Sequence, residues 1–159
     1  MNDYRKAMLY KYPSAIPVSV SFLPATWMKY GDALAEIVER HPALFQNFNR
    51  ESMDYASKPL SYNAGGFTDA WGCRWENVSE GYESIVTGHP VPNREDILSL
   101  EIPKKDIGLP HGFMYLRLAD LRGFEELMVD IAEEAPELDI LIEKVLQYNI
   151  RQVQQLLES

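Results

Sequence analysis

Apolar residues recur along this chain with two different periods. The segment Ile16-Pro17-Val18-Ser19-Val20-Ser21-Phe22 alternates apolar with small polar residues, which predicts a β-strand, and Pro17 lies near its start, where a missing N–H is tolerated. A second strand is predicted from His111 to Leu118. Helical spacing predicts four helices: Asn2 or Asp3 to about Tyr10, Thr26 to near His41, Gly123 to Glu134, and Pro136 to the C-terminus.

The last predicted helix carries the longest apolar stripe. The residues expected on its buried face are Leu138, Ile142, Val145, Leu146, Ile150, Val153 and Leu157. Burial of one large aliphatic side chain contributes roughly 1.5–3 kcal/mol. We therefore expect this face to be covered.

Three shorter features lie between the predicted strands. Residues 43–48 are expected to form one helical turn that buries Leu44, Phe45 and Phe48, and Asn93 is expected to cap a short helix with Leu98 and Leu100 facing inward. Extended structure is expected at 67–78 and 83–86, with a turn at Glu80-Gly81. Strand–helix units at both ends with this hairpin between them predict an α/β chain with parallel strands.

The stretch from Gly65 to Glu76 concentrates glycines, aromatic residues, acids and the single cysteine. One interpretation is a hairpin whose tryptophans fill a core and whose Asp69 caps a turn. The other is a pocket, because an acid between aromatic residues at a strand end is partly desolvated and its pKa can be tuned. The sequence leaves both open.

Composition narrows the classes of function. The chain has 159 residues, the size of one domain, with 46% hydrophobic residues and a net charge of −9. This charge argues against nucleic-acid binding and against an anionic membrane surface. One cysteine excludes an internal disulfide, and no signal peptide or membrane span is evident, so a cytoplasmic protein is expected.

Several segments, taken in order, resemble one enzyme superfamily. They are Tyr4-Arg5-Lys6 with Ile16-Pro17-Val18, Phe67-Thr68-Asp69 continuing to Trp75, His89-Pro90-Val91 with Asp96-Ile97 and Ile102-Pro103, and Leu121 to Leu127. Together they resemble the N-terminal part of the uroporphyrinogen decarboxylase superfamily, and the segment from Asp69 to Trp75 resembles its cobalamin-dependent methyltransferase branch.

The resemblance implies one N-terminal domain over residues 1–159, an incomplete (β/α)₈ TIM-barrel-like α/β fold with a β-hairpin excursion. A full barrel takes roughly 250 residues. The missing strands would come from another chain, so the partners implied are a corrinoid protein, the missing barrel half or a second copy of this chain. The resemblance also implies a small-molecule substrate.

The resemblance places Asp69 as the catalytic carboxylate and Phe67, Trp71, Trp75 and His111 around the substrate. Zinc and a corrinoid are implied for a full-length methyltransferase relative. In this chain Cys73 and the three histidines show no zinc-site spacing, so no metal site and no cofactor are expected here. The arginines that the decarboxylase branch needs after its first strand are absent between Ser19 and Trp27, which counts against decarboxylation.

An alternative from a different class is a non-catalytic short homologue. It would act as an interaction module through unpaired strand edges, which attract other strands.

Overall fold

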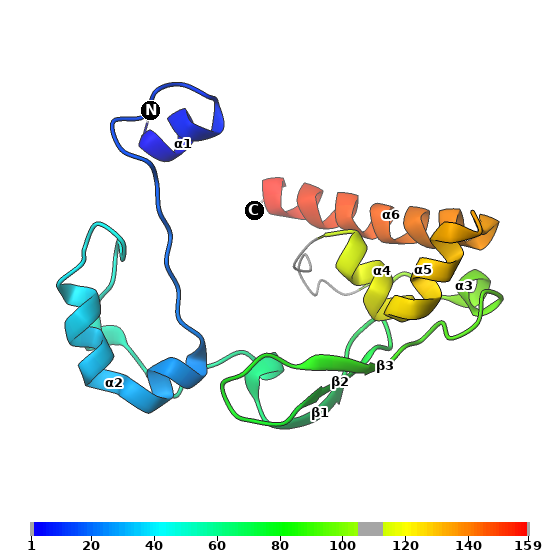
Figure 1. Ribbon diagram of the computed structural model, residues 1–159, viewed down its shortest axis with the longest axis horizontal. Helices are drawn as coiled ribbons and strands as arrows, with labels where there is room; N and C mark the ends of the chain where they lie inside the picture. Colours follow the sequence, from blue (N-terminus) through cyan, green and yellow to red (C-terminus); the bar gives the residue numbers. More distant parts are fainter. Residues whose placement is uncertain (1, 105–112, 159) are drawn as a thin grey trace. The chain divides into compact units, whose positions relative to one another are not determined.

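The computed structural model describes residues 2–104 and 113–158. These residues hold six α-helices, two short 3₁₀ turns and one open three-stranded antiparallel sheet, without a barrel (Figure 1). The chain divides into two compact units: unit 1 comprises residues 1–63 and 79–82, and unit 2 comprises residues 64–78 and 83–159.

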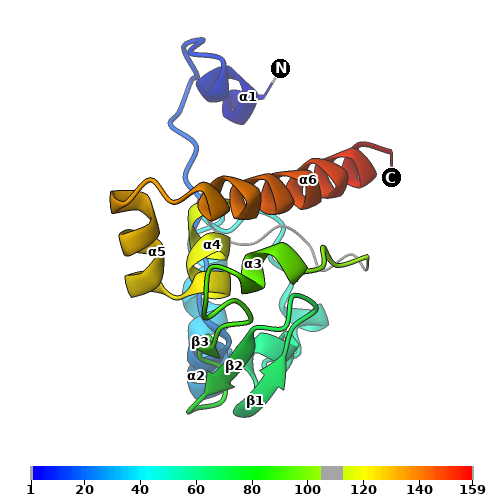
Figure 2. The same ribbon diagram turned by 90° about the vertical axis from the view of Figure 1, so that its right-hand side faces the viewer.

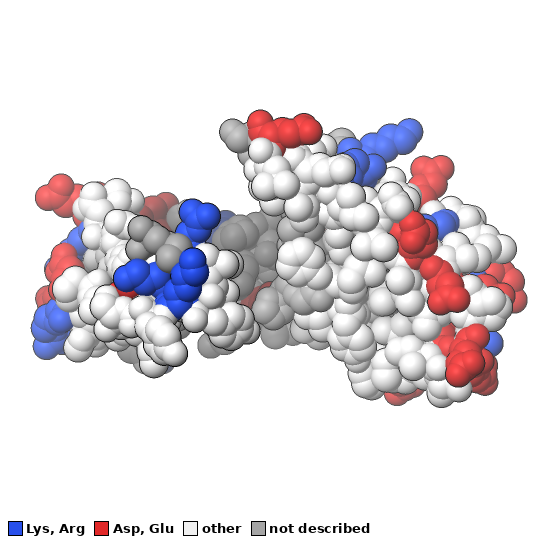
Figure 3. Space-filling model, turned by 90° about the horizontal axis from the view of Figure 1, so that it is seen from above, with Lys and Arg blue, Asp and Glu red and all other residues white. Residues whose placement is uncertain are grey.

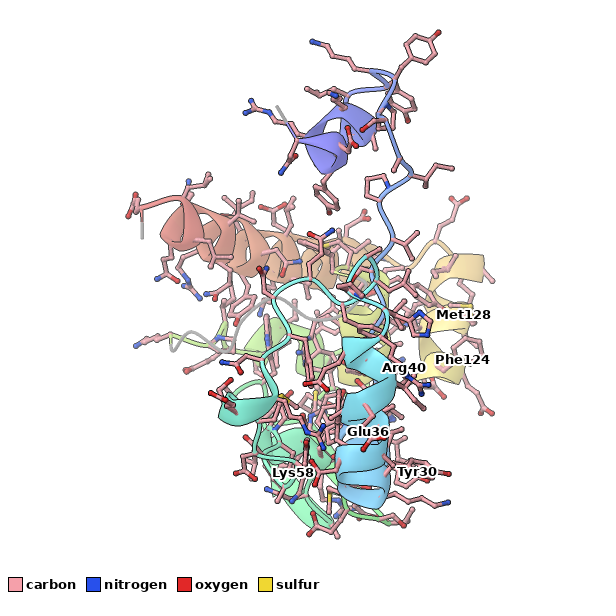
Figure 4. All side chains as sticks on the ribbon, turned by 90° about the vertical axis from the view of Figure 1, so that its left-hand side faces the viewer. Tyr30, Glu36, Arg40, Lys58, Phe124 and Met128 are labelled. Carbon is pink, nitrogen blue, oxygen red and sulfur yellow. The ribbon has the colours of Figure 1, made fainter. Side chains whose placement is uncertain are left out.

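Unit 1 contains two helices and two 3₁₀ turns. They are α1 (Asp3–Met8), α2 (Pro24–Glu39), η1 (Arg50–Ser52) and η2 (Leu60–Tyr62). The side chain of Asn2 caps α1, as predicted, by accepting a hydrogen bond from the N–H of Arg5 at 2.9 Å. Helix α2 begins two residues before the predicted start, with Pro24 in its first turn. Its exposed side includes Tyr30, Glu36 and, at its C-cap, Arg40 (Figure 4).

An aromatic cluster organises unit 1 around Trp27. Its indole stacks with the rings of Phe48 and Tyr55, both nearly parallel to it, with centroids 5.7 and 5.8 Å away. Phe22 meets Trp27 edge-on and stacks on Phe45. The predicted helical turn at 43–48 is a series of turns instead, and Leu44 is exposed rather than buried.

Unit 2 packs helices against one side of the sheet (Figure 2). The strands are β1 (Gly65–Thr68), β2 (Arg74–Asn77) and β3 (Ile85–Gly88), paired in sequence order. The helices are α3 (Asp96–Ser99), α4 (Tyr115–Arg122), α5 (Phe124–Ala132) and α6 (Pro136–Glu158). Their common core comprises Trp71, Cys73, Val91, Ile97, Leu118, Leu121, Leu127, Leu138, Leu141, Val145 and Tyr148.

The two predicted parallel strands are wrong in the described residues. Residues 16–22 form no sheet ladder. The described part of the segment 111–118 turns at Phe113 and enters helix α4. Leu116 is 39% exposed whereas Arg117 and Leu118 are buried, so burial there follows a helix and not a two-residue alternation. Because the only described sheet is antiparallel, the prediction of a parallel α/β fold is corrected.

Buried ionic groups join the helices of unit 2. Arg122 donates from Nε to Asp130 Oδ2 at 2.8 Å, and Arg94 donates from Nε to Asp130 Oδ1 at 2.7 Å. Lys144 of α6 binds the C-terminal end of the short helix α3. Its ammonium donates to the carbonyl oxygens of Ile97, Leu98 and Leu100. The predicted inward orientation of Leu98 is wrong, because its side chain is exposed and Ile97 is buried instead.

Helices α5 and α6 occupy the predicted ranges, but the buried face of α6 differs from the predicted one. Phe124 and Ile131 of α5 are exposed, and Phe124 and Met128 project side by side (Figure 4). On α6 the buried residues are Leu138, Leu141, Val145, Tyr148, Asn149 and Gln152. Two polar side chains of α6, those of Asn149 and Gln152, are therefore buried. The apolar residues Leu146, Ile150, Val153 and Leu157 of the same helix are exposed.

Candidate functional site

Asp69 lies in the tight turn that connects β1 to β2. Its Oδ1 accepts hydrogen bonds from the N–H groups of Trp71 at 3.0 Å and Cys73 at 2.9 Å. The Asp69 N–H donates to the carbonyl of Cys73 at 3.0 Å. Gly72 completes the turn with a φ of +90°, a conformation that L side chains rarely adopt. The local sequence thus uses Asp69 as a turn former, as the first interpretation of this stretch expects.

The second carboxylate oxygen of Asp69 joins the sheet to helix α4. Oδ2 accepts from the Trp75 indole N–H at 3.0 Å and from Arg117 Nη1 at 3.0 Å. The Asp69 and Arg117 side chains are only 11% and 8% exposed, so the ion pair is largely out of water. Each oxygen of the Asp69 carboxylate therefore accepts from two donors whose positions are fixed by the fold.

Cys73 and Asp120 lie beside this ion pair. The Cys73 thiol donates to the backbone carbonyl of Asp120 at 3.4 Å, and His89 Nδ1 lies 2.8 Å from the same oxygen. Burial, together with the negative charge of Asp69, raises the pKa of the Cys73 thiol to about 12. Burial also raises the pKa of Asp120. A thiol with such a pKa stays protonated at neutral pH and is a poor nucleophile or metal ligand.

The aromatic residues predicted to bind a substrate have different surroundings. Phe67 and Trp75 face each other across β1 and β2, half-buried, with parallel rings 6.1 Å apart. Trp71 is buried in the core, edge-on to Tyr148 at 5.2 Å. His111 lies outside the described residues. Asp69 and Trp75 are therefore brought together, and Trp71 lies in the core.

Arg117 is the residue of this network that sequence reasoning misses. The sequence pattern predicts a strand there, so nothing in it indicates that Arg117 reaches Asp69. The signal that could have found it is the spacing of Leu118, Leu121 and Arg122, which suits one face of a helix. In residues 2–104 and 113–158, no group of three His, Cys, Asp or Glu side chains has the geometry of a metal site.

A second feature is the seam of α6, which we define as Asp139, Glu143, Leu146, Ile150, Val153 and Leu157. These residues are spaced alternately four and three apart, the spacing of the contact positions of a coiled coil. All six are exposed, and Leu157 is 82% exposed. The seam is acidic at its N-terminal end and apolar over the rest of its length.

Charge is distributed unevenly between the two units. Unit 1 has seven basic and seven acidic residues, whereas unit 2 has eight basic and seventeen acidic ones, so the net charge of −9 resides in unit 2. Acidic side chains gather toward the right-hand end of Figure 3, where α5 and the start of α6 lie. Within the described chain, Asp139 and Glu143 form no ion pair.

In the part of the chain that the structure describes, no helix is both long and apolar enough to cross a membrane. Comparison of the chain with protein-family models, with curated proteins and with solved structures finds no match.

Proposed function

We propose that this chain is a non-catalytic interaction module and that the seam of α6 binds a helix of a partner protein. The observation that carries the proposal is the exposure of four seam residues, Leu146, Ile150, Val153 and Leu157, on the longest helix. A coiled-coil partner would remove the remaining exposed surface of these side chains from water. Leu146, Ile150 and Val153 are 38–42% exposed, so each would contribute about half or less of the roughly 1.5–3 kcal/mol that complete burial of an exposed side chain gives.

The chemistry around Asp69 supports binding over catalysis. Every carboxylate oxygen of Asp69 already accepts from fixed donors, and the neighbouring thiol of Cys73 is protonated. A general base or nucleophile needs a free lone pair within reach of a substrate. The network instead fixes the sheet to α4 and so keeps the helical layer in place.

The charges of the seam specify the chemistry of the partner. Asp139 and Glu143 occupy contact positions, so the facing positions of the partner suit lysine or arginine. The two cations of α6 do not neutralise them, because Lys144 binds the end of α3 and Arg151 donates to the carbonyl of Pro103. A helix tolerates cations best in its last turns. The partner helix is therefore antiparallel to α6, with an apolar run followed by basic residues.

A second copy of the chain fits this seam poorly. In a parallel pair, Asp139 and Glu143 would face the same acids of the other copy. In an antiparallel pair, the two acids would face Leu157 and Val153, and a carboxylate placed against apolar groups loses hydration without gaining a partner. The seam therefore favours a different protein.

A three-heptad helical peptide tests this proposal. It carries Leu or Ile at four contact positions and Lys at the last two, and its binding to the full chain is followed by fluorescence anisotropy. The double substitution Ile150→Gln with Val153→Gln is expected to weaken binding at least about tenfold, a loss of about 1.4 kcal/mol. Ile85→Gln, at an exposed apolar residue of β3, is the matched control and should leave binding unchanged. Equal binding by all three proteins would contradict the proposal.

A second proposal keeps the resemblance to the corrinoid-linked methyltransferases, with a porphyrinogen decarboxylase fragment as its variant. The observation in its favour is that the half-buried Phe67–Trp75 stack adjoins Asp69. On this proposal the chain contributes part of a substrate pocket. Residues 16–22 become a strand of the barrel only when the missing half of the barrel is present.

Fluorescence tests the second proposal. Methylcobalamin should quench tryptophan emission saturably in the wild type and in Trp27→Phe, but not in Trp75→Phe. The absence of saturable quenching up to ~100 μM corrinoid would exclude useful affinity and leave the interaction module alone.

A further inference from the structure

Residues 16–22 form an extended segment without a backbone hydrogen-bond partner among the described residues. Figure 1 shows this segment stretched between α1 and α2. Among the described residues, no backbone N–H or C=O of residues 16–22 forms a backbone hydrogen bond. The alternating sequence nevertheless suits a strand, and most of its side chains are exposed. The segment has the features of an unprotected sheet edge within unit 1.

Proline determines which edge of this segment can pair. The N–H groups of Ile16, Val18, Val20 and Phe22 all point to one edge of an extended chain, and those of alternate residues point to the other. Pro17 has no N–H, so the second edge lacks a donor. The edge bearing Ile16, Val18 and Val20 is therefore the one that can form a complete ladder.

The same residues line a hollow in unit 1. This open depression has a volume of about 1050 Å³, and its lining includes Ile16, Val18 and Val20 together with Leu44 and Phe48. Phe22 already stacks on Phe45 at 5.6 Å. An added strand would lie about 4.8 Å from the segment and bring further apolar side chains beside this depression.

We propose that this edge pairs with the same segment of a second copy of the chain, antiparallel and about a two-fold axis at Ser19. Ile16 then faces Phe22, and Val18 faces Val20, each as a hydrogen-bonded pair. β-branched and aromatic residues are favourable opposite one another. Pro17 falls in a non-hydrogen-bonded position, where its missing N–H costs nothing.

Charge also favours a second copy at this edge. Symmetric pairing brings a segment against itself, so a charged residue would meet a like charge or sit among apolar ones. Residues 15–23 contain no charged side chain, whereas natural edges are commonly protected by lysine. This inference rests on unit 1 and is independent of the partner proposed for α6.

Analytical ultracentrifugation of the full chain with two proline variants tests the pairing. Val18→Pro removes a donor from the pairing edge and is expected to raise the dimer dissociation constant at least about tenfold. Ser19→Pro removes a backbone N–H from the opposite edge and should leave the dimer dissociation constant unchanged. Circular dichroism checks that both variants keep the helices.

The wild-type chain should dimerise in this experiment. If it stays monomeric at ~200 μM the inference is overturned, because any dimer would then be too weakly bound to form a specific strand pair at the concentrations of the experiment. Equal effects of Val18→Pro and Ser19→Pro would overturn the assigned edge. A dimer that dissociates in the Ile150→Gln, Val153→Gln protein and not in Val18→Pro would place self-association on α6 and contradict both proposals.

Discussion

Arg117 Nη1 donates to Asp69 Oδ2 at 3.0 Å, so a residue of helix α4 holds the turn between β1 and β2. The bond spans 48 positions of sequence and joins the sheet to the helical layer of unit 2. The same oxygen accepts from the Trp75 indole. The ion pair therefore fixes the position of Trp75 as well as the turn.

Asp69→Asn is expected to destabilise the chain by up to about 3–5 kcal/mol, because it removes the nearer of the two carboxylates beside the buried Arg117 charge and leaves only Asp120 Oδ2, at 3.7 Å. Asparagine can keep the turn, since its carbonyl oxygen still accepts from Trp71 and Cys73. Urea denaturation measures the loss. Glu76→Gln, at an exposed carboxylate of β2, is the control and should change stability by less than about 0.5 kcal/mol. Similar losses of unfolding free energy in both variants would show that the ion pair of Asp69 with Arg117 does not stabilise the fold more than an exposed carboxylate does.

The Asp130 carboxylate makes stability depend on pH. Burial alone would raise its pKa, but hydrogen bonds from Arg122 and Arg94 hold the pKa below its usual value. A depressed folded-state pKa stabilises the fold above the unfolded pKa of about 3.9, and this stabilisation is lost as the pH falls through the folded pKa. The difference in unfolding free energy between wild type and Asp130→Asn should therefore be largest near pH 7 and shrink below about pH 4. A difference in unfolding free energy that does not change with pH would contradict the lowered pKa of Asp130. Glu101→Gln is the control variant.

Cys73 is expected to be chemically silent in the folded protein. With its pKa raised to about 12, the thiolate fraction at pH 8 lies on the order of 10³ below that of an ordinary cysteine. Ellman's reagent should react rapidly only after unfolding in guanidinium. If the native and unfolded proteins react at the same rate, the thiol is not buried as described.

Gly81, in unit 1, lies so close to the backbone of Ala25 that we expect no side chain to fit at this position. Its N–H donates to the Tyr62 carbonyl at 2.8 Å, and a Cβ there would overlap the backbone nitrogen of Ala25. Gly65 is the matched control, because it also has a positive φ but nothing lies within 4 Å of its added Cβ. Gly65→Ala should cost about 1–2 kcal/mol from backbone strain, and Gly81→Ala about 1–3 kcal/mol more from overpacking. Equal thermal shifts would contradict the close approach.

The helices are easier to predict from this sequence than the strands. Helical spacing locates α1, α2, α5 and α6, and the glycine- and aromatic-rich stretch 65–76 coincides with most of the hairpin of β1 and β2. Residues 113–118 are predicted wrongly because alternating Met114, Leu116 and Leu118 suit a strand locally. The ion pair of Arg117 with Asp69 and the burial of Leu118 and Leu121 favour a helix, and these tertiary contacts cannot be read from a single segment.

The buried face of α6 is predictable only in part, for a related reason. Hydrophobic patterning assigns apolar residues to the core, but Asn149 and Gln152 are buried and Ile150 and Val153 are not. Asn149 donates to the Phe113 carbonyl at 3.3 Å, a partner 36 positions earlier in the chain that the local pattern does not reveal. The exposed seam becomes visible only once the other face of α6 is assigned to the core.

Glu143 is the residue through which the proposed recognition of a basic, antiparallel helix is tested most directly. It is exposed and lies outside the core of unit 2, so Glu143→Lys changes the charge of the seam without disturbing the fold. The dissociation constants of two peptides, ending in Lys or in Glu at the last two contact positions, are measured for both proteins. We predict that the wild type prefers the Lys peptide and that Glu143→Lys reverses the preference. An unchanged preference would contradict recognition by the seam.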